Sequence, residues 1–377
     1  MEVTSLKWRS RRVSLGALIL LAGLGIAAMA VVEFSKIRVN KSYYEEKVIA
    51  SQLAFRAAEV VRSSKIGVQI VIDPIADRNA TGLIGDQFTI ITTDRGSLTA
   101  KLTTTNPNWA AVIVDMLHEA GVEAGDKVAV GYTGSMPALN IAALAAIQTI
   151  GAEPVIISSV GASMWGANNP EFAWLDIETL LYEKGIFRYR SVASTLGGRG
   201  DVGGNVSPEG RAILRAIIER NGVEKIEEPT LDANIKRRVE IYKSHLTEGE
   251  KYAAYINIGG GLGSIGSTQN LVPIKPGVNK RIPDANYPLR GAMIHIGAMG
   301  TPIINLTDVS ILANRYGLPI APEPLPDIPH GDVYFENRYR MHLVIPAFII
   351  YIALVFAVIR IDLNTILFGR KKKSSQS

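Results

Sequence analysis

The chain has 377 residues, of which 47% are hydrophobic and 20% are charged, and it contains no Cys. This composition excludes a disordered chain, and the lack of Cys excludes disulfides, Cys-ligated metal sites and a Cys nucleophile. The net charge of +5 belongs to the ends: residues 1–12 carry +3 and residues 360–377 carry +4, so the remainder carries 5 − 7 = −2. Because nucleic-acid-binding proteins cluster positive charge on the folded domain, we expect no nucleic-acid partner.

Two uncharged runs near the ends predict transmembrane helices. Residues 13–32 form a run of 20 and residues 343–359 a run of 17, close to the length that crosses the hydrocarbon core of a bilayer. Basic clusters flank both runs on the outer side, so the positive-inside rule predicts cytoplasmic termini and a central region outside the cytoplasm. The sequence Ala28-Met29-Ala30 also fits the cleavage site of a signal peptide, which leaves removal of the first segment as an alternative.

The segments between these runs complete the expected organisation at a bacterial plasma membrane. Whether the exported part is one domain or two is left open by its length. In chain order we expect a basic tail (1–12), a transmembrane helix (13–33), a stalk helix (34–66), an extracytoplasmic α/β domain (67–318), a Pro-rich arm (319–341), a second transmembrane helix (342–360) and a second basic tail (361–377).

Short apolar strands alternate with helices through the central region. This pattern predicts an α/β fold with a mainly parallel sheet covered by helices on both faces. The expected helices are 43–63, 109–120, 137–150, 176–184, one from Ser207, 230–246 and 307–316. The expected strands are 67–73, 127–132, 154–159, 187–193, 253–258 and 292–296.

Four predicted strands end in loops rich in Gly, Ser and Thr. Because ligands bind beyond the carboxyl ends of parallel strands, we expect these loops to form a binding site. The loop 131–135 opens a helix whose N-terminus suits a carboxylate or phosphate, although Ser135 could instead only cap that helix. The candidate ligand-binding residues in these loops are Thr133, Gly134, Ser135, Gly259, Gly260, Gly261 and Ser264.

Two arginines add a charged element to this prediction. Arg188 and Arg190 lie at i and i+2 of a predicted strand and would share one face, which suits a bidentate grip on carboxylates. An edge strand with ordinary solvated charges is the alternative. Arg199 and Asp201 follow in the loop GGRGDVGG, and Thr93–Gly96 is a further polar stretch expected to form a hairpin or loop.

No catalytic or cofactor motif in the sequence is complete. Ser163 lies in GASMWG, one residue longer than a nucleophile elbow, so Ser135 and Ser163 are candidate nucleophiles with His295 as candidate base. The glycines at 261–266 match the start of a dinucleotide fingerprint, but prolines follow where a helix is needed. We therefore expect no cofactor and no metal, and leave catalysis open with a preference against it.

Three stretches carry a resemblance to a known family. GYTGSMPALNIAALAA (131–146), ISSVGASMWGANNPEFAWLDIE (157–178) and TLGGRGD with SPEGR (195–201, 207–211) resemble the bacterial poly-gamma-glutamate system protein family, over most of residues 40–320. The resemblance implies a membrane-anchored accessory of poly-γ-glutamate synthesis or export, with the synthesis and export proteins as partners and the polymer as a ligand. The alternative is an exported hydrolase or transferase acting on γ-glutamyl chains. The resemblance supplies no catalytic residues.

Overall fold

The computed structural model describes residues 15–360, so the two basic tails lie outside the described residues, apart from Arg360 at the end of the last helix. The chain forms two compact units. One contains the residues up to Asn40 together with those from Phe335 onward, and the other is Lys41–Tyr334. The sheet and the Gly-rich loops all belong to the second unit.

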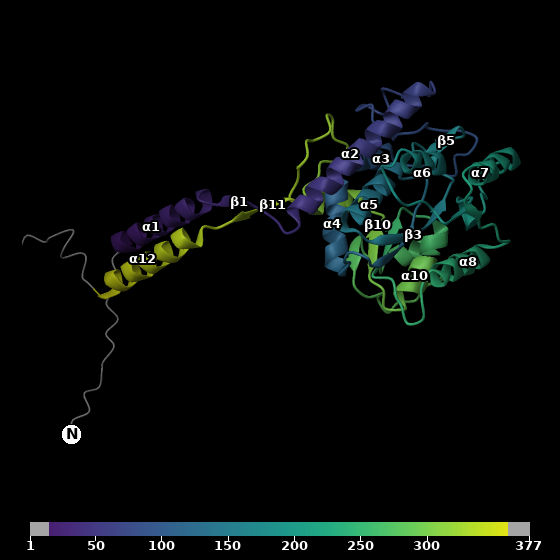
Figure 1. The fold of residues 1–377 in the computed structure, drawn as a ribbon. Coiled ribbons are helices and arrows are strands. Elements are labelled where there is room, and N and C mark those ends of the chain that lie inside the picture. The colour runs from purple at the N-terminus through teal and green to yellow at the C-terminus, as the bar shows by residue number, and fades with distance from the viewer. Residues whose placement is uncertain (1–14, 361–377) are drawn as a thin grey trace, which may run out of the picture. The chain divides into compact units, whose positions relative to one another are not determined.

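The first unit contains two long apolar helices joined to a small ribbon. Helices α1 (Leu15–Phe34) and α12 (Met341–Arg360) are long and apolar enough to cross a membrane, with mean hydropathies of 2.6 and 2.5. They pack on each other: a Cβ at Gly25 would lie 3.1 Å from Tyr351 Oη. Strands β1 (Ile37–Asn40) and β11 (Phe335–Arg338) pair antiparallel beside the helix ends (Figure 1).

The second unit is built on a seven-stranded sheet in the order β7-β6-β3-β2-β8-β10-β9. All neighbours pair in parallel except the edge strand β9, which runs antiparallel to β10. The strands are β2 (Lys127–Gly131), β3 (Glu153–Ser159), β6 (Ala193–Thr195), β7 (Glu224–Lys225), β8 (Ala254–Ile258), β9 (Gly277–Asn279) and β10 (Ile303–Leu306). A separate pair, β4 (Asn168–Asn169) with β5 (Phe172–Ala173), lies in the loop after β3. The strands β3, β6 and β7, which follow β2 in the chain, extend the sheet on one side of β2. The strands β8, β10 and β9 extend it on the other side, so the strand order reverses between β2 and β8.

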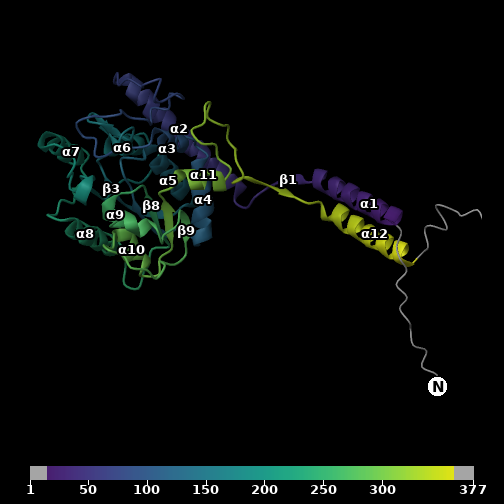
Figure 2. The same cartoon turned by 180° about the vertical axis from the view of Figure 1, so that it is seen from behind.

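Helices cover both faces of this sheet (Figure 2). On one face lie α2 (Tyr44–Gly67), α4 (Trp109–Ala120), α5 (Pro137–Ile150) and α6 (Trp174–Glu183). On the other lie α8 (Leu231–Ser244), α9 (Leu262–Ile265) and α10 (Ala292–Gly297), where Tyr242 and Met293 pack against Ala129 and Ile157. The remaining helices are α3 (Leu98–Thr104), α7 (Pro208–Arg220) and α11 (Val309–Arg315), with 3-10 turns at Arg199–Asp201 and Thr268–Leu271.

The predicted fold class, an α/β fold with a mainly parallel sheet and two terminal apolar helices, is confirmed. Three predicted strands are wrong in whole or in part. Residues 67–73 pair with no strand, because α2 continues to Gly67 and the following apolar side chains face solvent, with Val71 85% exposed. Residues 292–296 form α10, since a run of five apolar-rich residues has no period that separates helix from strand. The strand expected at 187–193 begins only at Ala193.

Residues 41–66 of the expected stalk and 319–334 of the Pro-rich segment belong to the same compact unit as the sheet. Helix α2 buries a stripe of small residues, and its Lys47 pairs with Asp115 of α4 at 2.6 Å. In the Pro-rich segment, the Asp327 carbonyl accepts a hydrogen bond from Asn108 Nδ2 at 3.0 Å. Burying the Ala-rich face of α2 stabilises the unit, which explains why this helix packs on α4 and α5.

Candidate functional site

A large cavity lies where the strand order reverses. It has a volume of about 560 Å³ and is lined by the loops that follow β2, β3, β6 and β8. Parallel sheets bind ligands at such a switch point because the loops on either side diverge and leave a crevice between them. A fifth segment, residues 93–101, closes one side of the cavity. The volume suits a small organic ligand or a few units of a polymer.

Ser163, Ser135 and Lys101 meet at one wall of this cavity. The Lys101 ammonium donates to Ser163 Oγ at 2.9 Å and makes a second, short contact with the carbonyl oxygen of Ser135. The backbone N–H of Ser163 donates to Ser135 Oγ at 3.0 Å. A serine hydroxyl held by a lysine amine is the arrangement that Ser–Lys hydrolases use for nucleophilic catalysis.

The burial of Lys101 decides its protonation. Only 3% of the residue is exposed, and burial lowers the pKa of its ammonium to about 7. Among the ion pairs of residues 15–360, none involves Lys101. A neutral amine has a free electron pair, so near neutral pH Lys101 can take the Ser163 proton as a general base.

The turn at 93–97 brings Lys101 to the serines. Thr93 N donates to the Ala162 carbonyl at 2.9 Å, and Met164 N donates to the Asp94 carbonyl at 3.0 Å, so the turn runs beside the loop after β3. A Cβ at Gly96 would lie 2.5 Å from the Met164 carbonyl oxygen and 3.1 Å from Ser163 Oγ. Glycine is therefore required for this approach. Ser97 then caps α3, which carries Lys101 on its second turn.

Asp201, which lines the cavity, belongs to a buried ion pair. Arg238 of α8 and Asp201 lie 3.1 Å apart and are 1% exposed each. Thr195 Oγ1 donates to Asp201 Oδ1 at 2.8 Å, and Arg238 Nη2 donates to Ser159 Oγ at 3.1 Å. Burial opposes the charge of Arg238, but Asp201 and neighbouring groups leave its pKa raised. This network holds the loop at 197–201, where Asp201 adopts a φ of 62°.

The exposed charges on the cavity wall are mainly positive. Arg95 and Arg199 line the cavity, and within the described part of the chain neither forms an ion pair. Asp94 contributes one exposed carboxylate, and the charge of Asp201 is matched by Arg238. The wall therefore favours an anionic ligand, although the middle of the chain is slightly acidic overall.

Most of the loop residues predicted from the sequence come together here. The residues among them that line the cavity are Thr133, Ser135, Ser163, Gly259, Gly260 and Gly261. Gly134 sits just behind this wall, where its carbonyl accepts from Ala167 N at 2.8 Å. Ser264 is turned away from the cavity and forms a buried hydrogen bond of 2.8 Å with the Tyr255 hydroxyl.

The structure does not bring the other three predicted residues to the cavity. Arg188 and Arg190 precede β6, level with the amino-terminal half of β3, whereas the cavity lies beyond its carboxyl end. Arg190 contacts the Asn221 carbonyl and the Tyr182 ring instead. His295 is exposed on α10 and does not line the cavity, so the expected Ser–His pair does not form.

Lys101 is a candidate functional residue that was not predicted from the sequence. It lies in TAKLTTT, and no acidic residue occurs between Asp94 and Asp115. A lysine with apolar and hydroxyl neighbours and no nearby carboxylate is a signal for an unpaired buried amine. That signal becomes specific only when the fold shows which hydroxyl the amine meets.

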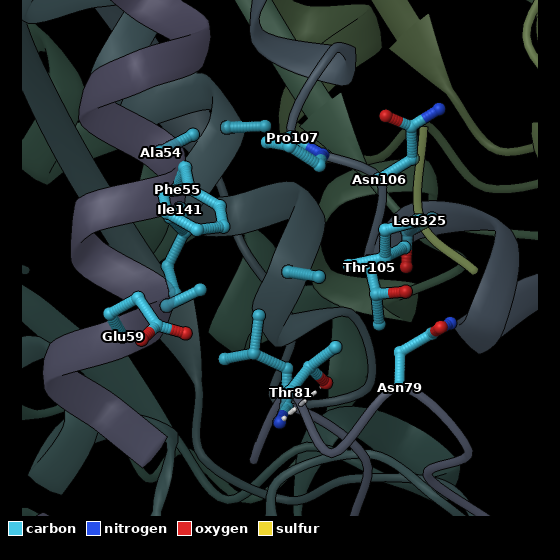
Figure 3. A pocket seen from close by; sticks show the side chains of 15 residues that line it. Ala54, Phe55, Glu59, Asn79, Thr81, Thr105, Asn106, Pro107, Ile141 and Leu325 are labelled. Atoms are coloured by element: carbon cyan, nitrogen blue, oxygen red, sulfur yellow. Dashed lines mark hydrogen bonds between the residues drawn. The ribbon is translucent and has the colours of Figure 1, made fainter. Parts of the chain in front are cut away.

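A second, smaller cavity lies between α2 and α5 (Figure 3). Its volume is about 90 Å³, and Phe55 and Ile141 give it an apolar wall. Of the described residues that line it, only Glu59 is charged. This cavity therefore offers no pair of groups for acid–base chemistry, and the cavity at the switch point is the candidate site.

Within residues 15–360, no group of three or more His, Cys, Asp or Glu side chains is arranged to hold a metal ion. No family model, no curated protein and no solved structure matches this chain.

Proposed function

We propose that the α/β unit is a serine–lysine acyl hydrolase or transferase, with Ser163 as nucleophile and Lys101 as general base. The 2.9 Å contact between Lys101 Nζ and Ser163 Oγ carries this proposal, because a neutral buried amine at that distance can accept the hydroxyl proton. Ser135 is a positioning residue, since its hydroxyl and carbonyl orient the Ser163 backbone and the Lys101 amine.

The reaction follows from these positions. Ser163 Oγ attacks the carbonyl carbon of an amide as its proton moves to Lys101 Nζ, giving a tetrahedral intermediate and an ammonium. Lys101 then returns the proton to the departing nitrogen, the C–N bond breaks, and the acyl group remains on Ser163 as an ester. Attack by water or by a second amine, with Lys101 again accepting the proton, releases the acyl group and restores the hydroxyl.

The charge of the cavity supports an anionic substrate. Arg95 and Arg199 line the cavity and would hold carboxylates beside the reacting carbonyl, the role predicted from the sequence for Arg188 and Arg190. A γ-glutamyl chain carries one carboxylate on each unit and joins its units by amides, so it fits both features. The resemblance to the poly-gamma-glutamate system protein family supports the same substrate class.

We propose further that α1 and α12 anchor the protein in the bacterial plasma membrane with both termini cytoplasmic. The basic clusters at residues 1–12 and 360–377 support this orientation. The α/β unit would then act outside the cytoplasm. Reporter fusions at residues 40 and 377 test the orientation, and matching signals from both sites would contradict it.

A fluorophosphonate probe tests the chemistry without a known substrate, because it labels activated serines. We expect the full-length protein at pH 8 to be labelled on Ser163, as mapped by peptide mass spectrometry. Labelling should be lost in Ser163→Ala and Lys101→Met and retained in Thr268→Ala, which alters another residue of the cavity wall. The active protein should also shorten γ-glutamyl oligomers or transfer their units. Failure of Ser163 to react in a folded protein would overturn the enzymatic proposal.

A non-catalytic accessory of poly-γ-glutamate synthesis or export is the second candidate. The contact of Lys101 with the Ser135 carbonyl favours it, because this contact ties α3 to the loop after β2 whether or not Lys101 acts as a base. Complementation of a deletion strain separates the two. If Ser163→Ala restores polymer yield and chain length while the pair Arg95→Gln/Arg199→Gln does not, the cavity binds polymer without cutting it.

A further inference from the structure

The ribbon of β1 and β11 has two different faces. Its register pairs Ile37 with Arg338 and Arg38 with Asn337. Because side chains alternate along each strand, Lys36, Arg38, Phe335 and Tyr339 fall on one face. Ile37, Val39, Glu336 and Arg338 fall on the other. We call the first the cation–aromatic face.

Each cation on this face lies over an aromatic ring of the opposite strand. The Arg38 guanidinium is 3.6 Å from the centroid of Phe335, and the Lys36 ammonium is 4.5 Å from the centroid of Tyr339. Both cations are thereby held in place on an exposed ribbon. Lys36 is partly neutralised by Glu33, but Arg38 has no ion pair within the described residues.

The ribbon adjoins the two apolar helices directly. Lys36 follows the end of α1 by two residues, and Tyr339 precedes the start of α12 by two residues. Residues 33–40 and 335–340 together contain four basic residues, Lys36, Arg38, Arg338 and Arg340, and two acidic residues, Glu33 and Glu336. If the helices span a bilayer, these groups are held at the depth of the lipid headgroups, where Tyr and basic side chains concentrate.

We propose that the cation–aromatic face, together with the neighbouring Arg340, binds the headgroups of anionic phospholipids in the leaflet opposite the cytoplasmic termini. Arg38 supplies the charge for the phosphate, Phe335 holds its guanidinium, and Tyr339 sits at the interface. Continuity with both helix ends identifies the partner, because the ribbon cannot leave the headgroup layer while the helices are inserted. The inference rests on the membrane anchoring proposed above and is independent of the Ser163 chemistry.

Site-resolved photo-crosslinking tests it on the full chain reconstituted in phosphatidylcholine vesicles. A small fraction of photoactivatable phosphatidylglycerol or, as control, photoactivatable phosphatidylcholine is included, and crosslinks are mapped by mass spectrometry. We expect phosphatidylglycerol to be favoured at residues 35–41 and 335–341. Each arginine should contribute about fivefold, so Arg38→Gln/Arg340→Gln should lower the preference about 25-fold. The control variant Arg237→Gln, at a partly exposed arginine of α8 outside the ribbon, should leave it unchanged.

The outcomes separate the two proposals. Crosslinks along α1 and α12 with either lipid, combined with equal labelling of the ribbon by both lipids, would overturn headgroup binding while supporting the anchor. A preference that survives in Arg38→Gln/Arg340→Gln would also overturn it. A lack of crosslinks along the helices would overturn membrane anchoring and the ribbon inference together.

Discussion

Lys101 and Arg238 are both buried cations beside the same cavity, but their surroundings differ in kind. Arg238 faces Asp201 at 3.1 Å and also donates to Thr195 Oγ1 at 2.6 Å, so its charge is matched and its donors are used. Lys101 meets only a hydroxyl and a carbonyl. Burial lowers the pKa of Lys101 to about 7, whereas Asp201 helps to keep the pKa of Arg238 raised.

The difference separates a structural cation from a reactive one. Removing one partner of a buried ion pair destabilises the fold, because the other charge is then buried without a partner. A buried amine without a carboxylate lowers stability at neutral pH, and in the proposed mechanism it acts as the base. The two residues should therefore respond to substitution in opposite ways.

The largest effect is expected from Lys101→Met. Removing the amine leaves Ser163 without a base, so the rate of probe labelling should fall by about 10³-fold or more. The unfolding free energy at pH 7 should not fall below that of wild type, because methionine fills similar space and removes an amine whose protonated form is disfavoured by burial. Probe labelling quenched at set times measures the labelling rate, and urea unfolding of the same preparation measures the unfolding free energy. Normal labelling in this variant would remove Lys101 from the mechanism.

Arg238→Met should act on stability first. It leaves the Asp201 carboxylate buried and unpaired, which costs about 3–5 kcal/mol of unfolding free energy. Urea unfolding followed by tryptophan fluorescence measures the loss. The double variant Asp201→Asn/Arg238→Met removes the stranded charge and should recover part of it. Equal destabilisation in the single and double variants would show that the ion pair is not the source.

Gly96→Ala sharpens the comparison at the reactive cation. The added Cβ would lie 2.5 Å from the Met164 carbonyl oxygen, so the turn must move away from Ser163. We expect labelling of Ser163 to slow by about 10²-fold, the loss that a displacement of about 1 Å produces in an active site. Gly260→Ala is the matched control, since its Cβ would meet no atom within 4 Å. Similar slowing in both variants would argue against a requirement for the close approach at residue 96.

The smallest effects concern pH. Burial lowers the pKa of Lys101 from 10.5 to about 7, so from pH 7 to 10 the unfolded chain binds a proton that the folded protein lacks, and stability rises with pH. Burial raises the pKa of Glu178 from 4.5 to about 7, so between those values the folded protein holds the extra proton and stability falls as pH rises. Each slope is at most about 1.4 kcal/mol per pH unit.

In Lys101→Met the rise of stability with pH should disappear, and in Glu178→Gln the fall of stability with pH should disappear. Thermal unfolding at several pH values measures both. Since both groups titrate near pH 7, labelling of Ser163 must be followed in Glu178→Gln as well. We expect labelling to increase through pH 7 in that variant as in wild type. Loss of this increase would assign it to Glu178 instead of Lys101.

Local patterns predicted the helices well and the short strands less well. The apolar periodicity of Trp109–Ala120 and Pro137–Ile150 defines both helices to the residue. The strand predicted at 292–296 is wrong because five residues are too few to show a period that separates strand from helix. The strand predicted at 67–73 is wrong because strand pairing depends on a neighbouring strand that the sequence does not reveal. Among site residues, Ser135 and Ser163 were found through their Gly-rich loops, but their expected partner His295 lies elsewhere.

The sequence by itself determined the fold class, the two apolar helices and the Gly-rich loops after the strands, because composition and periodicity act over short stretches of chain. Only the tertiary structure decided which side chains meet. The reversal of strand order between β2 and β8 opens the cavity, and the turn at 93–97 carries Lys101 to a serine 62 residues away. Burial then lowers the pKa of that amine, and burial is a property of the folded chain alone.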